Sequence, residues 1–371
     1  MFRRSNSRSV SGGHAVGAVS ALLCSVFCTA GALGDPTLTW SQRKVDAPPG
    51  TRYGHAIAYD PVRRVVVLFG GWKGAGPLSD TWEWDGRQWE QKFPTVKPPE
   101  PRVFHMMAYD AANAGVLLHG GTNLTPGNQF DDTWVWNGVD WSKQDAKGTG
   151  GRGSAGMAFD SDRNVVVLFG GVNVATGQRL EDTWEWDGKI WKEHPVLGPG
   201  KRGGPGMVYD YRNRCMVLFG GGDGSVALAD TWKGTWNPSE LKFVWEQIHV
   251  PGPSKRLEFA MAYDACRGVA LIFGGDGGPQ GGQLGDTWEW NGREWSQLPA
   301  QKAPSRRTAP MTYDSARGVC VLFGGNAGGI QVNDTWEYGF LRGDMNCDGA
   351  VNNFDIDAFV NCLTTGSCGC H

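Results

Sequence analysis

One set of sequence marks recurs six times along the 371-residue chain and constrains its fold more than any other feature. In each copy an arginine comes first, followed by an aromatic–Asp pair, an apolar run that ends in Gly-Gly, and an Asp-Thr-Trp triplet. The arginines are Arg52, Arg102, Arg152, Arg202, Arg256 and Arg306, at steps of 50, 50, 50, 54 and 50 residues. A register held over six copies indicates an array of repeated structural units.

Four short strands are predicted in each unit, as the first copy illustrates. Residues 55–60 alternate small and apolar side chains, and residues 65–69 form a β-branched run typical of a strand covered on both faces. Residues 81–84 alternate polar and aromatic side chains, and Asp85-Gly86 is a hairpin signal before a fourth strand that starts at Trp89. Four antiparallel strands in a period of about 50 residues are typical of a β-propeller blade.

The two ends of the repeat array complete each other. The sixth copy stops after Trp336 and Tyr338 without a fourth strand, whereas Leu38 to Gln42 has the pattern of one. We expect this N-terminal segment to pair with the last three strands and close the ring, because closure removes exposed sheet edges. The fold predicted for residues 35–341 is therefore all-β, a six-bladed β-propeller closed by an N-terminal strand.

The opening arginine, the aromatic–Asp pair, the Gly-Gly run and the paired aromatics together make the chain resemble the kelch-repeat family from Leu38 to Phe340. The resemblance implies a propeller of the kind found in galactose oxidase. It implies little about function, because propellers host many unrelated activities.

Tryptophan is abundant, and 17 of the 18 tryptophans follow the repeat. Six stand in the Asp-Thr-Trp triplets, six belong to fourth strands, and five lie shortly after the triplet: Trp84, Trp136, Trp186, Trp236 and Trp290. Side chains that recur in every blade are predicted to pack between blades. The same logic predicts ion pairs between the repeat arginines and the triplet aspartates; an arginine ring that binds anions is the alternative. These aspartates are Asp80, Asp132, Asp182, Asp230, Asp286 and Asp334.

Candidate binding residues are those that break the repeat. Trp72 lies in the loop after the first Gly-Gly, and His55 and His105 share a position that other copies fill with Ala, Pro or Phe. His119 replaces a phenylalanine present in the other five copies. Trp72, His55 and His105 are predicted to bind a ligand at the arginine end of the propeller, where the variable loops also lie. Two histidines without a third ligand do not make a metal site.

The first 34 residues do not fit the propeller. Arg3, Arg4 and Arg8 precede an apolar stretch from Ala15 to Ala32, and the small residues around Gly34 fit a signal-peptide cleavage site. We therefore expect a secreted protein in an extracellular, cell-surface or periplasmic location. The sequence has no other long apolar segment, so stable membrane insertion is not expected. A formal net charge of −3 argues against nucleic-acid binding.

Residues 342–371 carry the ligand spacing of a calcium loop, with Gly349 at the sharp turn. The predicted Ca²⁺ ligands are Asp344, Asn346, Asp348, the carbonyl of Ala350, Asn352 and Asp355. Because the last ligand is Asp and a helix-like segment follows, the loop resembles a single dockerin repeat, which implies a cohesin-like or cell-surface partner. Dockerins carry two such repeats, whereas one is visible here.

Cysteines are expected in two states. The disulfide candidates, which crowd the tail, are Cys347, Cys362, Cys368 and Cys370. Cys215 and Cys320 lie in predicted second strands, where buried free thiols are expected.

These observations predict an exported, monomeric propeller that binds a glycan or a protein, with a calcium-binding tail for attachment. Two alternatives stay open. One is a carbohydrate-active enzyme of the oxidase or epimerase type on a kelch propeller, and the other is a structural envelope protein. The copper ligands of an oxidase cannot be assembled from this sequence, whereas an epimerase type needs just a few Arg, His and Glu residues in the channel.

Overall fold

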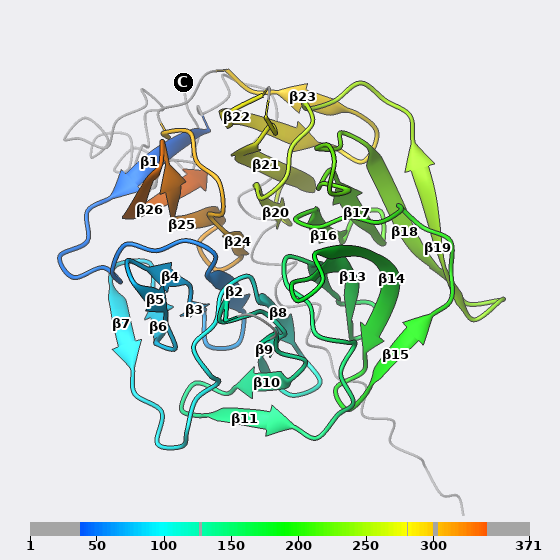
Figure 1. Ribbon diagram of the computed structural model, residues 1–371. Helices are drawn as coiled ribbons and strands as arrows, with labels where there is room; N and C mark the ends of the chain where they lie inside the picture. Colours follow the sequence, from blue (N-terminus) through cyan, green and yellow to red (C-terminus); the bar gives the residue numbers. More distant parts are fainter. Residues whose placement is uncertain (1–37, 126–127, 280, 300–302, 340–371) are drawn as a thin grey trace, which may run out of the picture.

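The computed structural model describes residues 38–125, 128–279, 281–299 and 303–339 of the chain. Within these residues, six four-stranded antiparallel sheets are arranged around a central axis as the blades of a propeller (Figure 1). The predicted signal peptide (1–34) and the predicted calcium-binding tail (342–371) lie outside the described residues. The fold class predicted for the propeller is confirmed.

Blades 1 to 3 each consist of four strands, named in order from the innermost to the outermost. Blade 1 is β2 (Ala56–Asp60), β3 (Val65–Phe69), β6 (Thr81–Trp84) and β7 (Trp89–Lys92). Blade 2 is β8 (Met106–Asp110), β9 (Gly115–His119), β10 (Thr133–Trp136) and β11 (Trp141–Gln144). Blade 3 is β12 (Gly156–Asp160), β13 (Val165–Asn173), β14 (Gln178–Trp186) and β15 (Trp191–His194).

The other three blades follow the same order. Blade 4 is β16 (Gly206–Asp210), β17 (Cys215–Phe219), β18 (Thr231–Asn237) and β19 (Lys242–Ile248). Blade 5 is β20 (Ala260–Asp264), β21 (Val269–Asp276), β22 (Gln283–Trp290) and β23 (Trp295–Gln297). Blade 6 is β24 (Met311–Asp314), β25 (Val319–Ala327), β26 (Ile330–Gly339) and β1 (Thr39–Arg43). A two-stranded hairpin of β4 (Trp72–Lys73) and β5 (Gly76–Pro77) lies in the loop between β3 and β6.

The N-terminal strand closes the ring as predicted. β1 pairs antiparallel with β26, with Trp40 opposite Tyr338 and Thr39 opposite Gly339. The Trp40 indole is buried, stacks on Phe273 of blade 5, and donates from Nε1 to Thr287 Oγ1 at 3.1 Å. The other five fourth-strand tryptophans make the equivalent bond to the preceding blade: Trp89 to Thr335, Trp141 to Thr81, Trp191 to Thr133, Trp245 to Thr183 and Trp295 to Thr231.

The repeat arginines brace the blades at one end of the propeller. The Arg52 guanidinium donates twice to the Asp80 carboxylate, at 2.8 Å each, and once to the carbonyl of Gly70. Asp80 also accepts from the indole of Trp82 at 2.7 Å. All six blades repeat this arrangement, and all six arginines are buried. The predicted ion pairs are therefore confirmed, and the paired, buried arginines do not form an anion-binding ring.

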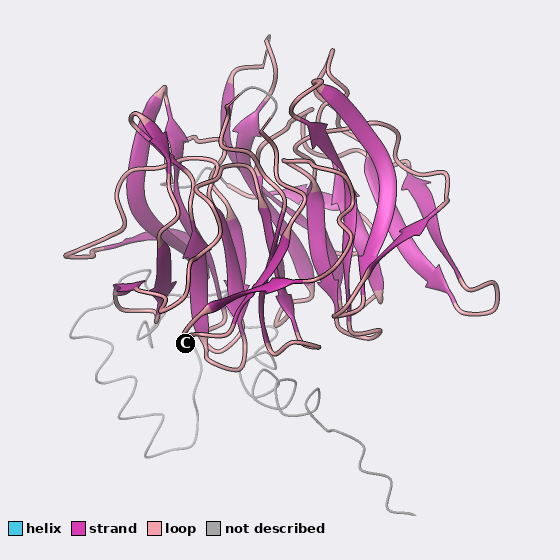
Figure 2. Ribbon diagram, turned by 60° about the horizontal axis from the view of Figure 1, so that its bottom comes forward, coloured by secondary structure: helices cyan, strands magenta, loops and turns pink. Residues whose placement is uncertain are grey.

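The Gly-Gly pairs allow the blades to approach each other at this end. Gly70 and Gly71 have φ angles of 62° and 98°, in the region that favours glycine. A Cβ atom on Gly70 would lie 2.8 Å from the carbonyl oxygen of Arg102 in the next blade. We call this end of the propeller the Arg end. The long hairpins between second and third strands rise from it, and the short turns lie at the opposite end (Figure 2).

Blade 4 departs from the predicted tryptophan pattern. Gly234, and not Trp236, pairs with Met216 in the register that Trp84 occupies in blade 1. The ring of Phe243 lies where an aromatic on Gly234 would have to go, 2.7 Å from a Cβ atom placed there. Phe243 stacks on Trp245 with ring centroids 5.2 Å apart, compared with 5.5 Å for Trp84 and Trp89 in blade 1. The assignment of Trp236 to the repeated set was therefore wrong, because a residue from the adjacent strand fills the space.

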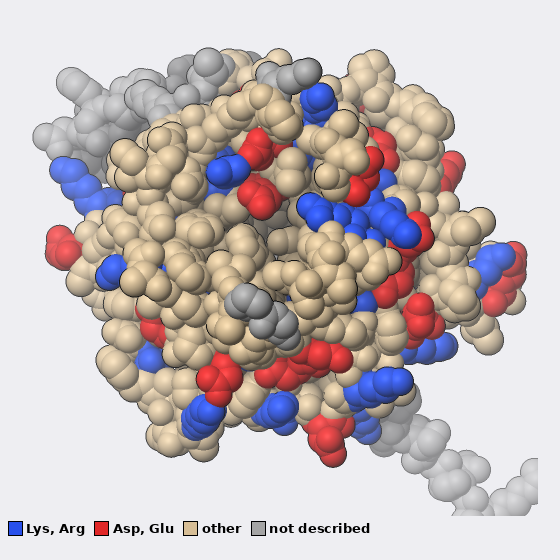
Figure 3. All heavy atoms as spheres, viewed as in Figure 1, with Lys and Arg blue, Asp and Glu red and all other residues tan. Residues whose placement is uncertain are grey.

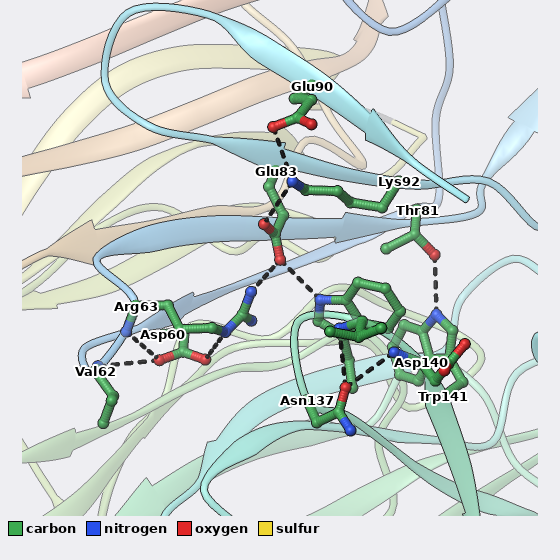
Figure 4. A network of polar contacts seen from close by, with 12 residues as sticks. Asp60, Val62, Arg63, Thr81, Glu83, Glu90, Lys92, Asn137, Asp140 and Trp141 are labelled. Carbon is green, nitrogen blue, oxygen red and sulfur yellow. Dashed lines mark hydrogen bonds and ion pairs between the residues drawn. The ribbon is translucent and has the colours of Figure 1, made fainter. Parts of the chain in front are cut away.

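A second charged network near the opposite end was missed in the sequence. Arg63 lies between Asp60 and Glu83 and pairs with both (Figure 4). Blades 3, 5 and 6 repeat this trio with Arg163, Arg267 and Arg317. Blades 2 and 4 lack both the arginine and the glutamate: they carry Asn113 with Val135, and Asn213 with Lys233. Comparison of the six copies position by position would have revealed this paired exchange.

Candidate functional site

His119, which breaks the repeat, has a structural role. Its ring is fully buried and stacks on Trp191 at 4.8 Å, as Phe69 stacks on Trp141 at 5.1 Å in blade 1. Its two nitrogens lie 3.0 Å from the hydroxyls of Thr133 and Thr149. The imidazole thus takes the packing position of the phenylalanine and adds two hydrogen bonds.

His55 and His105 lie between blades close to the central axis. Both are buried, and their rings stand edge-on against Phe323 and Phe69 of the preceding blades, at 5.5 Å each. Phe259 packs on Phe219 in the same way in blade 5. Neither ring nitrogen of either histidine has a well-formed hydrogen bond within the described chain. Burial and Arg102 lower the pKa of His105 to about 3, so it is neutral near pH 7. A role for either histidine in binding stays a prediction.

A closed circle of backbone hydrogen bonds surrounds the axis at the Arg end, just before the innermost strands. Each bond runs from the N–H of one blade to the carbonyl of the equivalent residue in the blade before it. The bonds are Gly54 to Thr308 (3.4 Å), Phe104 to Gly54 (2.7 Å), Ser154 to Phe104 (2.8 Å), Gly204 to Ser154 (2.7 Å), Glu258 to Gly204 (3.1 Å) and Thr308 to Glu258 (2.8 Å). We call these six residues the mouth ring.

The six residues of the mouth ring share one backbone conformation but carry different side chains. All six residues have φ between 51° and 65°, which is unusual for Phe104, Ser154, Glu258 and Thr308. Because the ring has six members, Phe104 lies opposite Glu258 across the axis. The Phe104 ring leans over Gly54, and the Glu258 side chain leans over Gly204. A rigid backbone thus presents an aromatic group and a carboxylate to the same opening.

Six bridged residue pairs surround the mouth ring, one in each blade, and we call them the rim pairs. They are Tyr53–Trp72, Val103–Thr122, Gly153–Val172, Gly203–Gly222, Leu257–Asp276 and Arg307–Asn326. Their character changes around the axis, from aromatic in blade 1, through small in blades 3 and 4, to charged in blades 5 and 6. Figures 1 and 3 look onto this end, and charged side chains gather there over β20–β22 and β16–β17 beside the central hollow.

Trp72 lies at the Arg end, as predicted, but its indole N–H is already used. The side chain is partly exposed and belongs to the rim pair of blade 1. Nε1 donates to the carbonyl of Gly74 in its own turn at 3.0 Å. The indole N–H is therefore engaged within the chain, whereas the face of the indole stays partly accessible. Tyr53 and Phe104, with ring centroids 6.3 Å apart, extend the aromatic part of the rim.

The charged part of the rim was not predicted from the sequence. Arg307 pairs with Asp276, which also accepts from the N–H of Gly278 at 2.8 Å. Glu258 has no hydrogen bond or ion pair to its carboxylate within the described residues. Burial raises the pKa of Glu258 more than the charge of Arg307 lowers it. These residues fall outside the repeat motifs, so a comparison of motifs alone passes over them.

The described residues contain neither a metal-ligand cluster nor a membrane-spanning helix. Across them, no three His, Cys, Asp or Glu side chains gather as ligands for a metal ion. Helices able to cross a bilayer are likewise absent from the described ranges. Cys215 and Cys320 are buried and free, as predicted, whereas Cys266 is disulfide-bonded.

Comparison with known proteins supports the interpretation of the repeats. Residues 33–189 match the family model of the KLHDC2/KLHL20/DRC7 Kelch-repeats domain. This range contains blades 1 and 2 and the first three strands of blade 3. No curated protein matches the chain. Residues 33–189 are therefore similar to a Kelch-repeats domain, and the described chain forms a closed six-bladed β-propeller.

Proposed function

We propose that this propeller binds a segment of a partner protein at its Arg end, through the mouth ring and the rim pairs. One observation supports the proposal above all: the six blades share one frame of braces and backbone hydrogen bonds, yet present a different side-chain pair at each rim position. A structural role alone would not require this variety. Rigid scaffolds that carry variable loops are a common basis for recognition.

Apolar loop tips at the same end support a protein as the partner. Leu124 and Val226 are 40% and 51% exposed in the loops between second and third strands of blades 2 and 4, and Ile330, 69% exposed, starts the third strand of blade 6 at the same end. Exposed apolar side chains around a polar opening are a feature of protein-binding surfaces. Kelch propellers generally serve as protein-binding modules, which agrees with this arrangement.

The proposal is tested by blocking the mouth ring. A random peptide library displayed on phage is selected against the full chain, and enriched peptides are then tested against Ser154→Arg. We expect the arginine to fill the opening and reduce binding at least tenfold. Val62→Arg serves as the matched control, because Val62 is 66% exposed in a turn at the opposite end. Equal loss in both variants, or no loss in Ser154→Arg, would contradict the proposed site.

A glycan ligand is the second candidate, favoured by the aromatic rim pair of Tyr53 and Trp72. An indole face can stack on the apolar face of a sugar ring even when its N–H is occupied. On a glycan array, Trp72→Ala should lose any signal that the native chain gives. A signal that persists in this variant would place the sugar elsewhere.

The predicted signal peptide (1–34) and the predicted calcium-binding tail (342–371) belong to the same proposal. We propose export, and attachment through a Ca²⁺-bound tail to a cohesin-like or other cell-surface partner. The position of Gly339 supports this, because the described chain ends at the short-turn end, away from the proposed binding site. The enzyme and envelope alternatives stay predictions.

A further inference from the structure

We propose that the mouth ring admits a lysine or arginine side chain of the bound segment, and that Glu258 is the residue that pairs with it. This inference rests on the proposed function and specifies the ligand chemistry of that site. It follows from the conformation of Glu258, from the charges around it, and from the aromatic group on the other side of the opening.

Glu258 is held firmly at the opening. Its N–H donates to Gly204 and its carbonyl accepts from Thr308, so its backbone is part of the circle. Its φ of 54° is unfavourable for a glutamate, and glycine at the equivalent positions of blades 1 and 4 shows that the fold does not need this side chain. The side chain leans over Gly204, which leaves the adjoining sector without a side chain.

The charges around Glu258 leave its carboxylate uncompensated. Arg307, whose charge lowers the pKa of Glu258, is itself paired with Asp276. Together these three groups carry one excess negative charge. Arg179, on the hairpin of blade 3, donates to the carbonyl of Gly177 in its own turn at 2.6 Å. A partly buried carboxylate without a partner is destabilised by desolvation, and a cation that binds next to it relieves that cost.

The side of the opening opposite Glu258 suits the same ligand. With neighbours spaced about 5 Å apart, the mouth ring is roughly 10 Å across. Phe104 and Tyr53 occupy the far side, where aromatic faces attract cations and pack against aliphatic chains. Lysine and arginine combine an aliphatic stem with a terminal positive charge, so one such side chain can contact both sides of the opening.

The experiment compares peptide preferences of native and variant chains. A phage-displayed random dodecapeptide library is selected on the native full chain and on Glu258→Gln, Glu258→Arg and Glu181→Gln. Glu181 is an exposed carboxylate of β14 near the Arg end and is the matched control. We expect Lys and Arg to be enriched at one peptide position on the native chain and on Glu181→Gln. The enrichment should disappear on Glu258→Gln and change to Asp or Glu on Glu258→Arg.

The outcomes separate this inference from the function on which it rests. If peptides are selected without a basic preference, or with one that Glu258→Gln leaves unchanged, the inference is overturned while peptide binding stands. If no peptide is selected on the native chain, both are overturned. Thermal melting of each variant establishes that it is folded, and Glu258→Arg provides a change of preference that loss of structure cannot imitate.

Discussion

At the residue scale, the second charged network can be tested because blades 2 and 4 replace both its arginine and its glutamate. Glu83 accepts from Arg63, and also from the Trp136 indole of the next blade at 2.8 Å. In blade 2, where Val135 replaces the glutamate, the equivalent Trp186 indole donates to Asp110 at 2.8 Å. Blade 2 therefore shows that the fold accepts asparagine and valine in place of the arginine and the glutamate of the trio.

We expect Glu83→Val to reduce the free energy of unfolding by about 3 kcal/mol, because it removes one of the two carboxylates that pair with the partly buried Arg63. The double variant Arg63→Asn/Glu83→Val should recover at least about 1 kcal/mol, since it reproduces the arrangement of blade 2. Urea denaturation of the native chain, both single variants and the double variant measures this coupling. Additive losses would show that the two positions vary independently.

A second prediction at this scale concerns pH. Burial, followed by Arg102 for His105 and Arg152 for His119, lowers the pKa of each to about 3, against 6.5 for an ordinary histidine. Between these pH values the unfolded chain binds protons that the folded chain does not. The contribution of these two histidines to the free energy of unfolding is therefore fully present above about pH 6.5 and falls as the pH is lowered.

Phenylalanine at these positions should remove part of that dependence. His119→Phe introduces the residue that the other five blades use there, and His105→Phe introduces the residue that blade 5 uses there. We expect both to give a flatter dependence of Tm on pH between about pH 4 and about pH 7. Calorimetry across this range measures it. His249→Gln is the matched control, because it removes a histidine that is exposed. An unaltered slope in both Phe variants would show that these histidines do not cause the acid sensitivity.

At the element scale, β1 is the strand on which closure depends. Trp40 is 1% exposed and contacts Phe273 of blade 5 and Tyr338 of blade 6. We expect Trp40→Ala to reduce the free energy of unfolding by roughly 3–5 kcal/mol, because it leaves a cavity between two blades. Trp72→Ala is the matched control and should cost far less. Similar losses for both, measured by urea denaturation, would show that β1 is not needed for closure.

Elements with strong periodicity were predictable from the sequence, and exceptions filled from another strand were not. The ranges 65–69 and 81–84 were predicted as strands and observed as β3 and β6, because apolar and turn signals mark them locally. Closure by the N-terminal segment followed from counting strands. Gly234 was missed because Phe243, which fills its space, belongs to the next strand and lies outside the motif.

At the scale of the whole molecule, the sequence predicted the end that carries the variable loops, but not the mouth ring. Glu258 and Phe104 acquire their importance from a backbone circle that links all six blades, and no local pattern marks it. His55 and His105 attracted attention because they break the repeat, yet they lie buried where Phe259 lies in blade 5. A break in a repeat thus signals altered packing as readily as a binding site.

The predicted tail can be tested in the intact protein. Titration calorimetry of the full chain should show one Ca²⁺ bound with a dissociation constant on the order of 10⁻⁴ to 10⁻³ M, the weak extracellular class. Asp344→Ala should remove the heat, because it deletes the first predicted ligand. Heat that survives this substitution would place the ion elsewhere, and heat equal to that of buffer in the native chain would rule out the site.

The pairing of β26 with both β25 and β1 has a mechanical consequence. If a partner holds the Arg end and the tail is anchored, tension enters the propeller at Gly339 and runs along β26. Ladder hydrogen bonds in an antiparallel sheet lie perpendicular to the strands. Those on both sides of β26 would therefore be strained together in shear, and would not be peeled apart one after another. Such an arrangement suits a protein that resists steady pulling between two attachment points.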